Sequence, residues 1–152
     1  ILTGGRGAAE ADVARAIATA EHAGRIDRTG RVPGTDLARH LADADVVAFP
    51  STYEGFGIPV LEAMAAGVAV LVADGTPAAD LVQGCDAIVG AGDPAAWAEA
   101  LDRLLADRDH RTALAARVLA AAQDRTWEAS AAALERAWRL LLGRSAPAGR
   151  RA

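Results

Sequence analysis

Apolar residues along the chain fall into short runs that alternate with longer segments in which they recur every three or four positions. Short apolar runs bounded by glycine or proline are typical of buried strands, and the longer period is typical of covering helices. Strands are predicted at "ILTGG", "RIDRTGRV", "DVVAFP", "VAVLVA" and "DAIVG". Helices are predicted over residues 8–24, 33–44, 59–66, 76–84, 93–107, 109–124 and 126–142.

The alternation of strands and helices predicts an α/β fold with a parallel, helix-covered sheet of Rossmann type. Gly24 is expected to end the first helix, and Thr35 is expected to cap the start of the second. The last helix carries Trp127 and Trp138 on one apolar face. We expect both of these side chains, and Trp97 on an earlier helix, to lie in the core.

The length of 152 residues suits one domain with a single sizeable core. We predict one domain over residues 1–142, followed by a polar, flexible tail over 143–152. The chain opens on Ile1, and its first residues already have the pattern of a strand. A segment upstream is therefore expected.

The composition argues against binding to nucleic acid or to a membrane. The net charge of −4 argues against nucleic acid and against an anionic membrane surface as partners. No apolar stretch reaches the roughly 18 residues that a membrane span needs, so a soluble chain is expected, and the single cysteine fits a reducing, cytoplasmic location. Membrane association of a longer parent stays open.

Cys85 is the only cysteine, so neither an internal disulfide nor a multi-cysteine metal site is possible, and the histidines are scattered. No metal site is predicted.

The segment "STYEGFGI" joins a predicted strand to a predicted helix that opens at Pro59. Ligands of parallel sheets bind beyond the carboxyl ends of the strands, where such segments lie. Gly55 and Gly57 let the backbone approach a ligand, and a helix start favours an anion. Glu62 follows Pro59 by three residues, which predicts a place in the first helical turn, facing the same cleft as Glu54.

Each of these residues also has a purely structural interpretation. A carboxylate near a helix start complements the helix dipole, a loop glutamate is often solvated, and two glycines can make an ordinary turn. Together, two carboxylate acceptors around a group of backbone amides suit a ligand with hydroxyls and phosphates, as in a nucleotide sugar.

The stretch "FPSTYEGFGIPVLEAMAAGVAVLVAD" resembles the signature of retaining glycosyltransferases with the GT-B fold, which use nucleotide diphosphate sugars. That signature has two glutamates with seven residues between them, within "PS-x-x-EGFG-x-P-x-LEAMA-x-G". Weaker similarities at "ILTGGRG", "TGRVPGTDLARHLADADVVAFPS", "GAGDPAAWAEAL" and "WEASAAALERAW" extend the resemblance over nearly the whole chain.

The resemblance implies that this is the donor-binding half of such an enzyme. It assigns Glu54 as the catalytic residue beside the hydroxyls of the donor sugar and Glu62 as the acceptor of hydrogen bonds from the ribose. The backbone amides that would contact the sugar and the diphosphate belong to Gly55, Phe56, Gly57 and Ile58. It further implies that no cofactor and no divalent metal are needed.

The resemblance also assigns residues near the start of the chain. The segment around Val32 matches the loop that holds the nucleotide base, mostly through its backbone. Gly4 and Gly5, in "GGRG", end the first predicted strand, and this position makes them candidates for lining the donor cleft. A lone glycine cluster is more often a tight turn, and Arg6 gains no role from it.

The sequence departs from the family pattern in two places. The segment "DGTPAADLV" has Thr76 and Pro77 where the family commonly has two glycines, and Asp80 where it has a glutamate. The start lacks a strand-helix unit, with an arginine and a lysine that neutralise the diphosphate, and the amino-terminal acceptor domain. We expect this fragment alone to be inactive or nearly so. Without its central strand, the sheet should either pair "ILTGG" directly with "DVVAFP" or associate through exposed edges.

Sequence therefore predicts transfer of a sugar from a nucleotide diphosphate to an acceptor hydroxyl with retained anomeric configuration. Two alternatives stay open, which are a non-catalytic nucleotide-sugar-binding module and a nucleotide-sugar epimerase on the same fold. The base, the sugar and the acceptor are not specified by the sequence.

Overall fold

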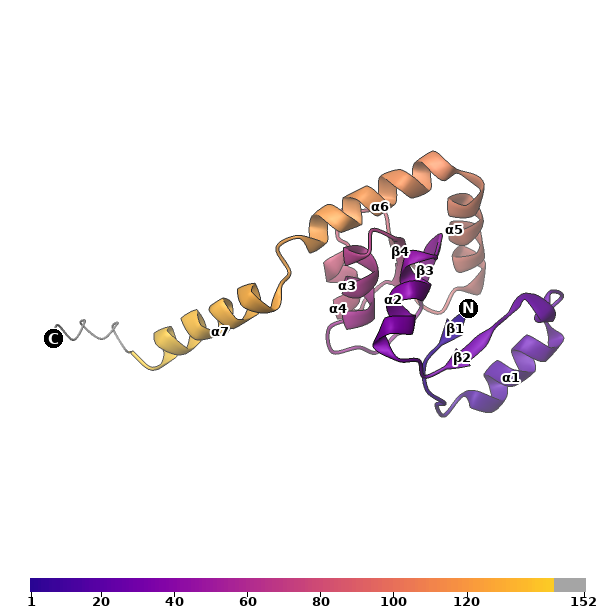
Figure 1. Ribbon diagram of the computed structural model, residues 1–152, viewed down its shortest axis with the longest axis horizontal. Coiled ribbons are helices and arrows are strands. Elements are labelled where there is room, and N and C mark those ends of the chain that lie inside the picture. Colours follow the sequence, from indigo (N-terminus) through magenta and orange to yellow (C-terminus); the bar gives the residue numbers. More distant parts are fainter. Residues whose placement is uncertain (144–152) are drawn as a thin grey trace. The chain divides into compact units, whose positions relative to one another are not determined.

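The computed structural model describes residues 1–143, drawn in colour in Figure 1. The chain divides into two compact units, Ile1–Asp43 and a second that begins at Ala44. Each unit is an α/β assembly of parallel strands flanked by helices, as the pattern of apolar runs predicts. They are called unit 1 and unit 2 and are described separately.

Unit 1 is built on two short parallel strands, β1 (Leu2–Thr3) and β2 (Arg28–Gly30). Its other elements are α1 (Glu10–Thr19), the 3-10 turn η1 (Ala23–Arg25) and α2 (Gly34–Ala42). No side chain of unit 1 is buried.

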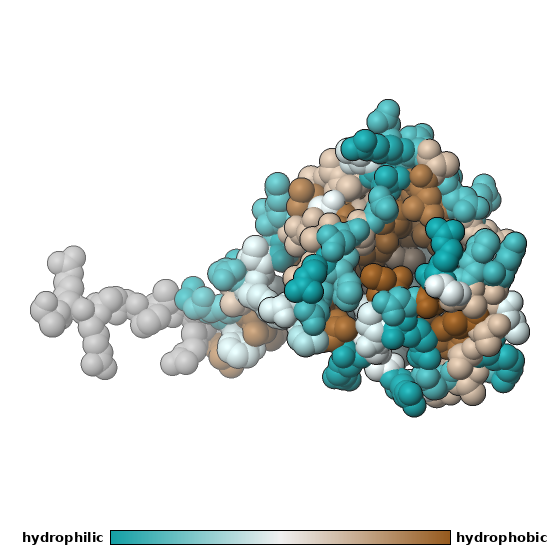
Figure 2. Space-filling view, turned by 45° about the vertical axis from the view of Figure 1, so that its right-hand side comes forward, coloured by the Kyte–Doolittle hydropathy of each residue, from teal (hydrophilic) through white to brown (hydrophobic). Residues whose placement is uncertain are grey.

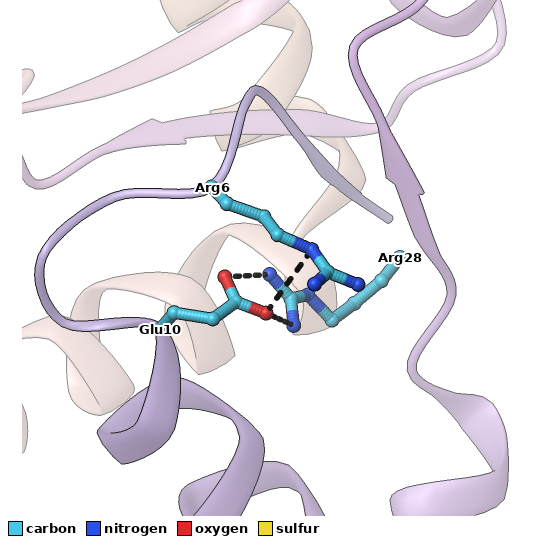
Figure 3. A network of polar contacts seen from close by, with 3 residues as sticks. All are labelled: Arg6, Glu10 and Arg28. Carbon is cyan, nitrogen blue, oxygen red and sulfur yellow. Dashed lines mark hydrogen bonds and ion pairs between the residues drawn. The ribbon is translucent and has the colours of Figure 1, made fainter.

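An ion pair joins α1 to β2 in unit 1 (Figure 3). Both guanidinium nitrogens Nη1 and Nη2 of Arg28 donate to the Glu10 carboxylate, at 2.8 and 3.0 Å. The Nε of Arg6 lies 3.9 Å from the same carboxylate. These hydrogen bonds from Arg28, together with the charges of both arginines, lower the pKa of Glu10 below its usual 4.5.

This contact predicts a pH-dependent stability of unit 1. A carboxylate whose pKa is lowered by folding stabilises the fold above its unfolded pKa, and the contribution is lost as pH falls through the lowered pKa. Hydrogen exchange of the α1 and β2 amides should therefore be slower in the wild type than in Glu10→Gln at pH 7. The difference should shrink as pH falls below about 4.5. Exposed Glu21→Gln is the control, and a difference that stays constant with pH would refute the role of Glu10.

Unit 2 contains a three-stranded parallel sheet in the order β3-β4-β5, made of β3 (Val46–Phe49), β4 (Ala69–Ala73) and β5 (Ile88–Val89). Every residue of β4 is buried, which fits a central strand covered on both faces. Helices α3 (Ile58–Ala65), α4 (Pro77–Leu81) and α6 (Arg108–Ala122) contact β4, and α5 (Pro94–Ala106) contacts β3 and β5. The largest fully buried side chains are Met64, Leu71, Leu81, Leu104 and Leu114.

Side-chain caps explain where the later helices begin. The Asp93 carboxylate accepts from the amides of Ala95 and Ala96 at the start of α5. Asp107 does the same for α6, and Thr126 for α7 (Trp127–Leu141). Such caps satisfy amides that have no partner inside the helix.

The two predicted helix ends in unit 1 are wrong. Helix α1 ends at Thr19, because Ala20 adopts an extended backbone, and Gly24 lies in the 3-10 turn instead. Thr35 is already inside α2, which is preceded by Pro33. The Pro33 carbonyl accepts from the amides of Asp36 and Leu37, and no side chain caps this helix start.

The prediction that the tryptophans lie in the core is wrong for α7. Trp127 and Trp138 are 79% and 58% exposed, and no side chain of α7 is buried. Trp97 is half-buried, and its indole Nε1 donates to the Gly90 carbonyl. Apolar side chains reach the surface among hydrophilic ones in Figure 2 as well. The predicted tail over residues 143–152 lies, apart from Gly143, outside the described residues.

Direct pairing of the first strand with "DVVAFP" is not found. Among residues 1–143, β1 pairs with β2 within unit 1, and β3 pairs with β4 within unit 2. Within the same residues, no helix is both long and apolar enough to cross a membrane.

Candidate functional site

The loop over residues 50–57 lies at the carboxyl end of β3, between that strand and α3. Because β3 and β4 are parallel, with Phe49 opposite Val72, this loop and the segment that follows β4 lie at the same edge of the sheet. Glu54 is half-buried in the loop, and the Ser51 hydroxyl donates to its Oε1 at 2.9 Å. Tyr53, next to it, is 94% exposed.

Gly57 ends this loop in a conformation that few other residues adopt. It precedes α3 with a φ of 97°, and it is buried. A β-carbon added there would lie 2.6 Å from the Cβ of Ala78 on α4. Only glycine lets the start of α3 approach α4 this closely.

The amides of residues 55–58 are free of acceptors among the described residues. None of them donates a hydrogen bond to another group of residues 1–143. The amides of Val60 and Leu61, by contrast, both donate to the Gly57 carbonyl, and Pro59 has no amide hydrogen. The donors at this helix start are therefore those of residues 55–58, as expected for a group that receives an anion.

Glu62 is not in the first helical turn, contrary to the expectation from sequence. Helix α3 begins at Ile58, so Glu62 is its fifth residue, about 6 Å along the axis from Ile58. It lies on the exposed face with Ile58, opposite the buried Val60 and Met64. Long side chains on helices tend to lean toward the amino end, and in α3 that end follows the loop of residues 50–57.

The remaining predicted site residues lie in unit 1. Gly4 follows β1, and its amide donates to the Gly30 carbonyl at the end of β2 at 2.9 Å. The Arg31 guanidinium lies 3.7 Å from where a Gly5 β-carbon would stand. Unit 1 thus brings the "GGRG" turn next to the segment that contains half-buried Val32.

The segment after β4 accommodates its departure from the family pattern. Thr76 is buried, and its hydroxyl donates to the Ala73 carbonyl, so it occupies a small space without an unpaired polar atom. Ala78, two residues later, is fully buried against Gly57. Asp80 is exposed and accepts from the Gln83 amide at 3.4 Å.

Sequence reasoning did not single out Ser51 or Ala78. The one signal in the sequence for the first contact is that Ser51 lies three positions before Glu54 in the same predicted loop. Nothing in the sequence signals the second. It arises from the packing of α3 against α4.

Other features of the described chain do not involve the predicted residues. An open cavity of about 220 Å³ in unit 2 is lined by Leu71, Asp86, Ile88, Val89, Gly90, Ala96, Glu99, Ala100 and Arg103. Cys85 is buried and forms no disulfide within residues 1–143. Residues 1–143 contain no group of three or more His, Cys, Asp or Glu side chains that could hold a metal ion.

Comparison with known proteins identifies a family and several relatives. Residues 1–107 match the family described as glycosyl transferases group 1. The chain is 33% identical over 141 residues to the O-antigen chain mannosyltransferase B of Escherichia coli, covering 93% of this chain and 37% of that protein. It spans well under half the length of the curated relatives that it matches.

Solved structures show the same architecture. The sucrose-phosphate synthase of Thermosynechococcus elongatus has a TM-score of 0.83 and 27% identity, over 95% of this chain and 38% of that one. HepE of Anabaena, solved in complex with UDP and glucose, has a TM-score of 0.73 and 24% identity, over 92% of this chain and 39% of that one. These chains share the fold of both units.

Proposed function

The chain belongs to the glycosyl transferases group 1 family, and on that premise we propose that it binds the nucleotide diphosphate sugar donor of a retaining glycosyltransferase. One observation carries the proposal. The loop after β3 places half-buried Glu54, the free amides of residues 55–58 and, beyond them, Glu62 at one edge of a parallel sheet. Donors for phosphate and acceptors for hydroxyls thus lie on one continuous segment.

Each group has a distinct task in this proposal. The amides of residues 55–58 donate to the diphosphate and the sugar, and the partial positive charge at the start of α3 favours the negative leaving group. Glu62 accepts hydrogen bonds from the ribose. Glu54 contacts the sugar hydroxyls, where its negative charge stabilises the positive charge that develops on the sugar in the transition state. Val32, Gly4 and Gly5 belong to the base and donor subsites.

The reaction belongs to a longer polypeptide in this proposal. This chain corresponds to 37% of the mannosyltransferase, and an amino-terminal domain would supply the acceptor site. An arginine and a lysine outside residues 1–152 would neutralise the diphosphate, so the fragment alone would turn over little or no donor. We propose a cytoplasmic enzyme that needs no divalent metal. UDP-sugars are suitable first donors to test, since HepE binds UDP.

Glu54 should affect turnover and not nucleotide affinity. Replacing the carboxylate by an amide, Glu54→Gln, keeps the size of the side chain but removes its charge. We expect kcat of the parent enzyme to fall about 10-fold, as for the loss of one charge-assisted contact in the transition state. The Kd of the sugar-free nucleotide, measured by calorimetry, should stay unchanged. Parallel loss of kcat and nucleotide affinity would contradict this assignment.

A further inference from the structure

Glu54 lies on a loop without regular secondary structure, so backbone hydrogen bonds of a helix or strand do not orient its side chain. The chain from its Cα to its carboxylate has three rotatable bonds. A charged group that must meet a sugar at a defined position needs some other constraint. The structure contains one candidate for that constraint.

The Ser51 hydroxyl is within reach of two acceptors. It lies 2.9 Å from Glu54 Oε1 and 3.3 Å from the Tyr53 carbonyl oxygen. A hydroxyl has one proton to donate, and the shorter contact is to the ionised group, which is the stronger acceptor. The proton therefore points mainly to Glu54. Both Ser51 and Glu54 are half-buried, which restricts competition from water.

We propose that Ser51 is a positioning residue, which holds Glu54 through Oε1 and leaves Oε2 free for the hydroxyls of the donor sugar. This inference rests on the proposed function of Glu54. A carboxylate held by one oxygen pays less rotational entropy when the other oxygen meets the substrate. Ser51 itself does not contact the donor.

A mutant cycle in the parent enzyme tests this inference. Ser51→Ala should lower kcat by about 3- to 10-fold, while the Kd of the sugar-free nucleotide stays unchanged. Ser51→Thr keeps the hydroxyl and should restore at least half of the lost kcat. In a Glu54→Gln background, Ser51→Ala should change kcat less than about 2-fold, because the two side chains act as one unit. The control is Ser130→Ala, which removes an exposed serine hydroxyl from α7 and should have no effect.

Failure of this inference differs from failure of the proposed function. If Glu54→Gln lowers kcat but Ser51→Ala does not, the positioning role of Ser51 is wrong and the role of Glu54 stands. If Ser51→Ala lowers kcat equally in the wild type and in the Glu54→Gln variant, the positioning role of Ser51 is also wrong. If Glu54→Gln itself leaves kcat unchanged, the role of Glu54 is wrong. Should Ser51→Ala fold poorly, the comparison of Ser51→Thr with Ser51→Cys decides, because cysteine is a weak donor.

Discussion

Substitution of Gly57 by alanine is expected to destabilise the junction of α3 and α4 by several kcal/mol. A non-glycine residue with a φ near 97° costs about 1–2 kcal/mol. The added methyl group would also stand 2.6 Å from the Ala78 Cβ and 3.2 Å from its Cα. Forcing a methyl into a packed core typically costs about 1–3 kcal/mol. The sum, roughly 2–5 kcal/mol, is a large part of the usual total stability of about 5–15 kcal/mol.

Hydrogen exchange of the α3 and α4 amides measures this effect where it arises. The matched control is Gly55→Ala in the same loop, because Gly55 has no heavy atom within 4 Å of an added β-carbon and no left-handed backbone. In Gly55→Ala, the free energy of opening derived from exchange of these amides should change by less than about 0.5 kcal/mol. Similar exchange rates in the two variants would show that the close approach to Ala78 does not limit this position.

Glu62→Ala should weaken binding of the nucleoside diphosphate to the parent enzyme by roughly 10- to 150-fold. This range corresponds to the loss of charge-assisted hydrogen bonds of about 1.5–3 kcal/mol. Glu62 is exposed on α3, and it makes no side-chain hydrogen bond or ion pair within residues 1–143, so its removal should not disturb the fold. The loss should therefore appear in the Kd and not in the thermal stability of the free protein.

Two further variants sharpen this test. Glu62→Gln keeps one acceptor oxygen and should fall between the wild type and Glu62→Ala. Glu99→Ala, which removes an exposed glutamate from α5, should leave the Kd unchanged. An unaltered Kd in Glu62→Ala would show that Glu62 does not contribute to nucleotide binding.

The sequence predicted the strands and most of the helices because their signals are local. The apolar run "VAVLVA" contains β4, whose residues are all buried, and Asp93 before Pro94 marks the start of α5. The start of α3 was misplaced by one residue. Proline suits either of the first two helical positions, and the left-handed conformation of Gly57 makes Ile58 the first.

The sequence did not predict which helices, strands and loops contact one another. The period of α7 identifies an apolar face correctly but does not say what covers it, and Trp127 and Trp138 are exposed. The glycines of "EGFG" signalled a special loop, yet the reason that Gly57 cannot change is Ala78, which is 21 positions away in the sequence. The orientation of Glu54 likewise depends on the loop bringing Ser51 within 2.9 Å.

The central claim is that residues 50–62 bind the donor, and hydrogen exchange of the parent enzyme with and without a nucleoside diphosphate tests it most directly. UDP, GDP and ADP should be compared, each with its glucose or mannose form. At saturating concentration, at least one of them should slow exchange in residues 50–62, above all at the free amides of residues 55–58. A nucleotide that binds without protecting this segment, or the absence of binding by every nucleotide tested, would contradict the claim.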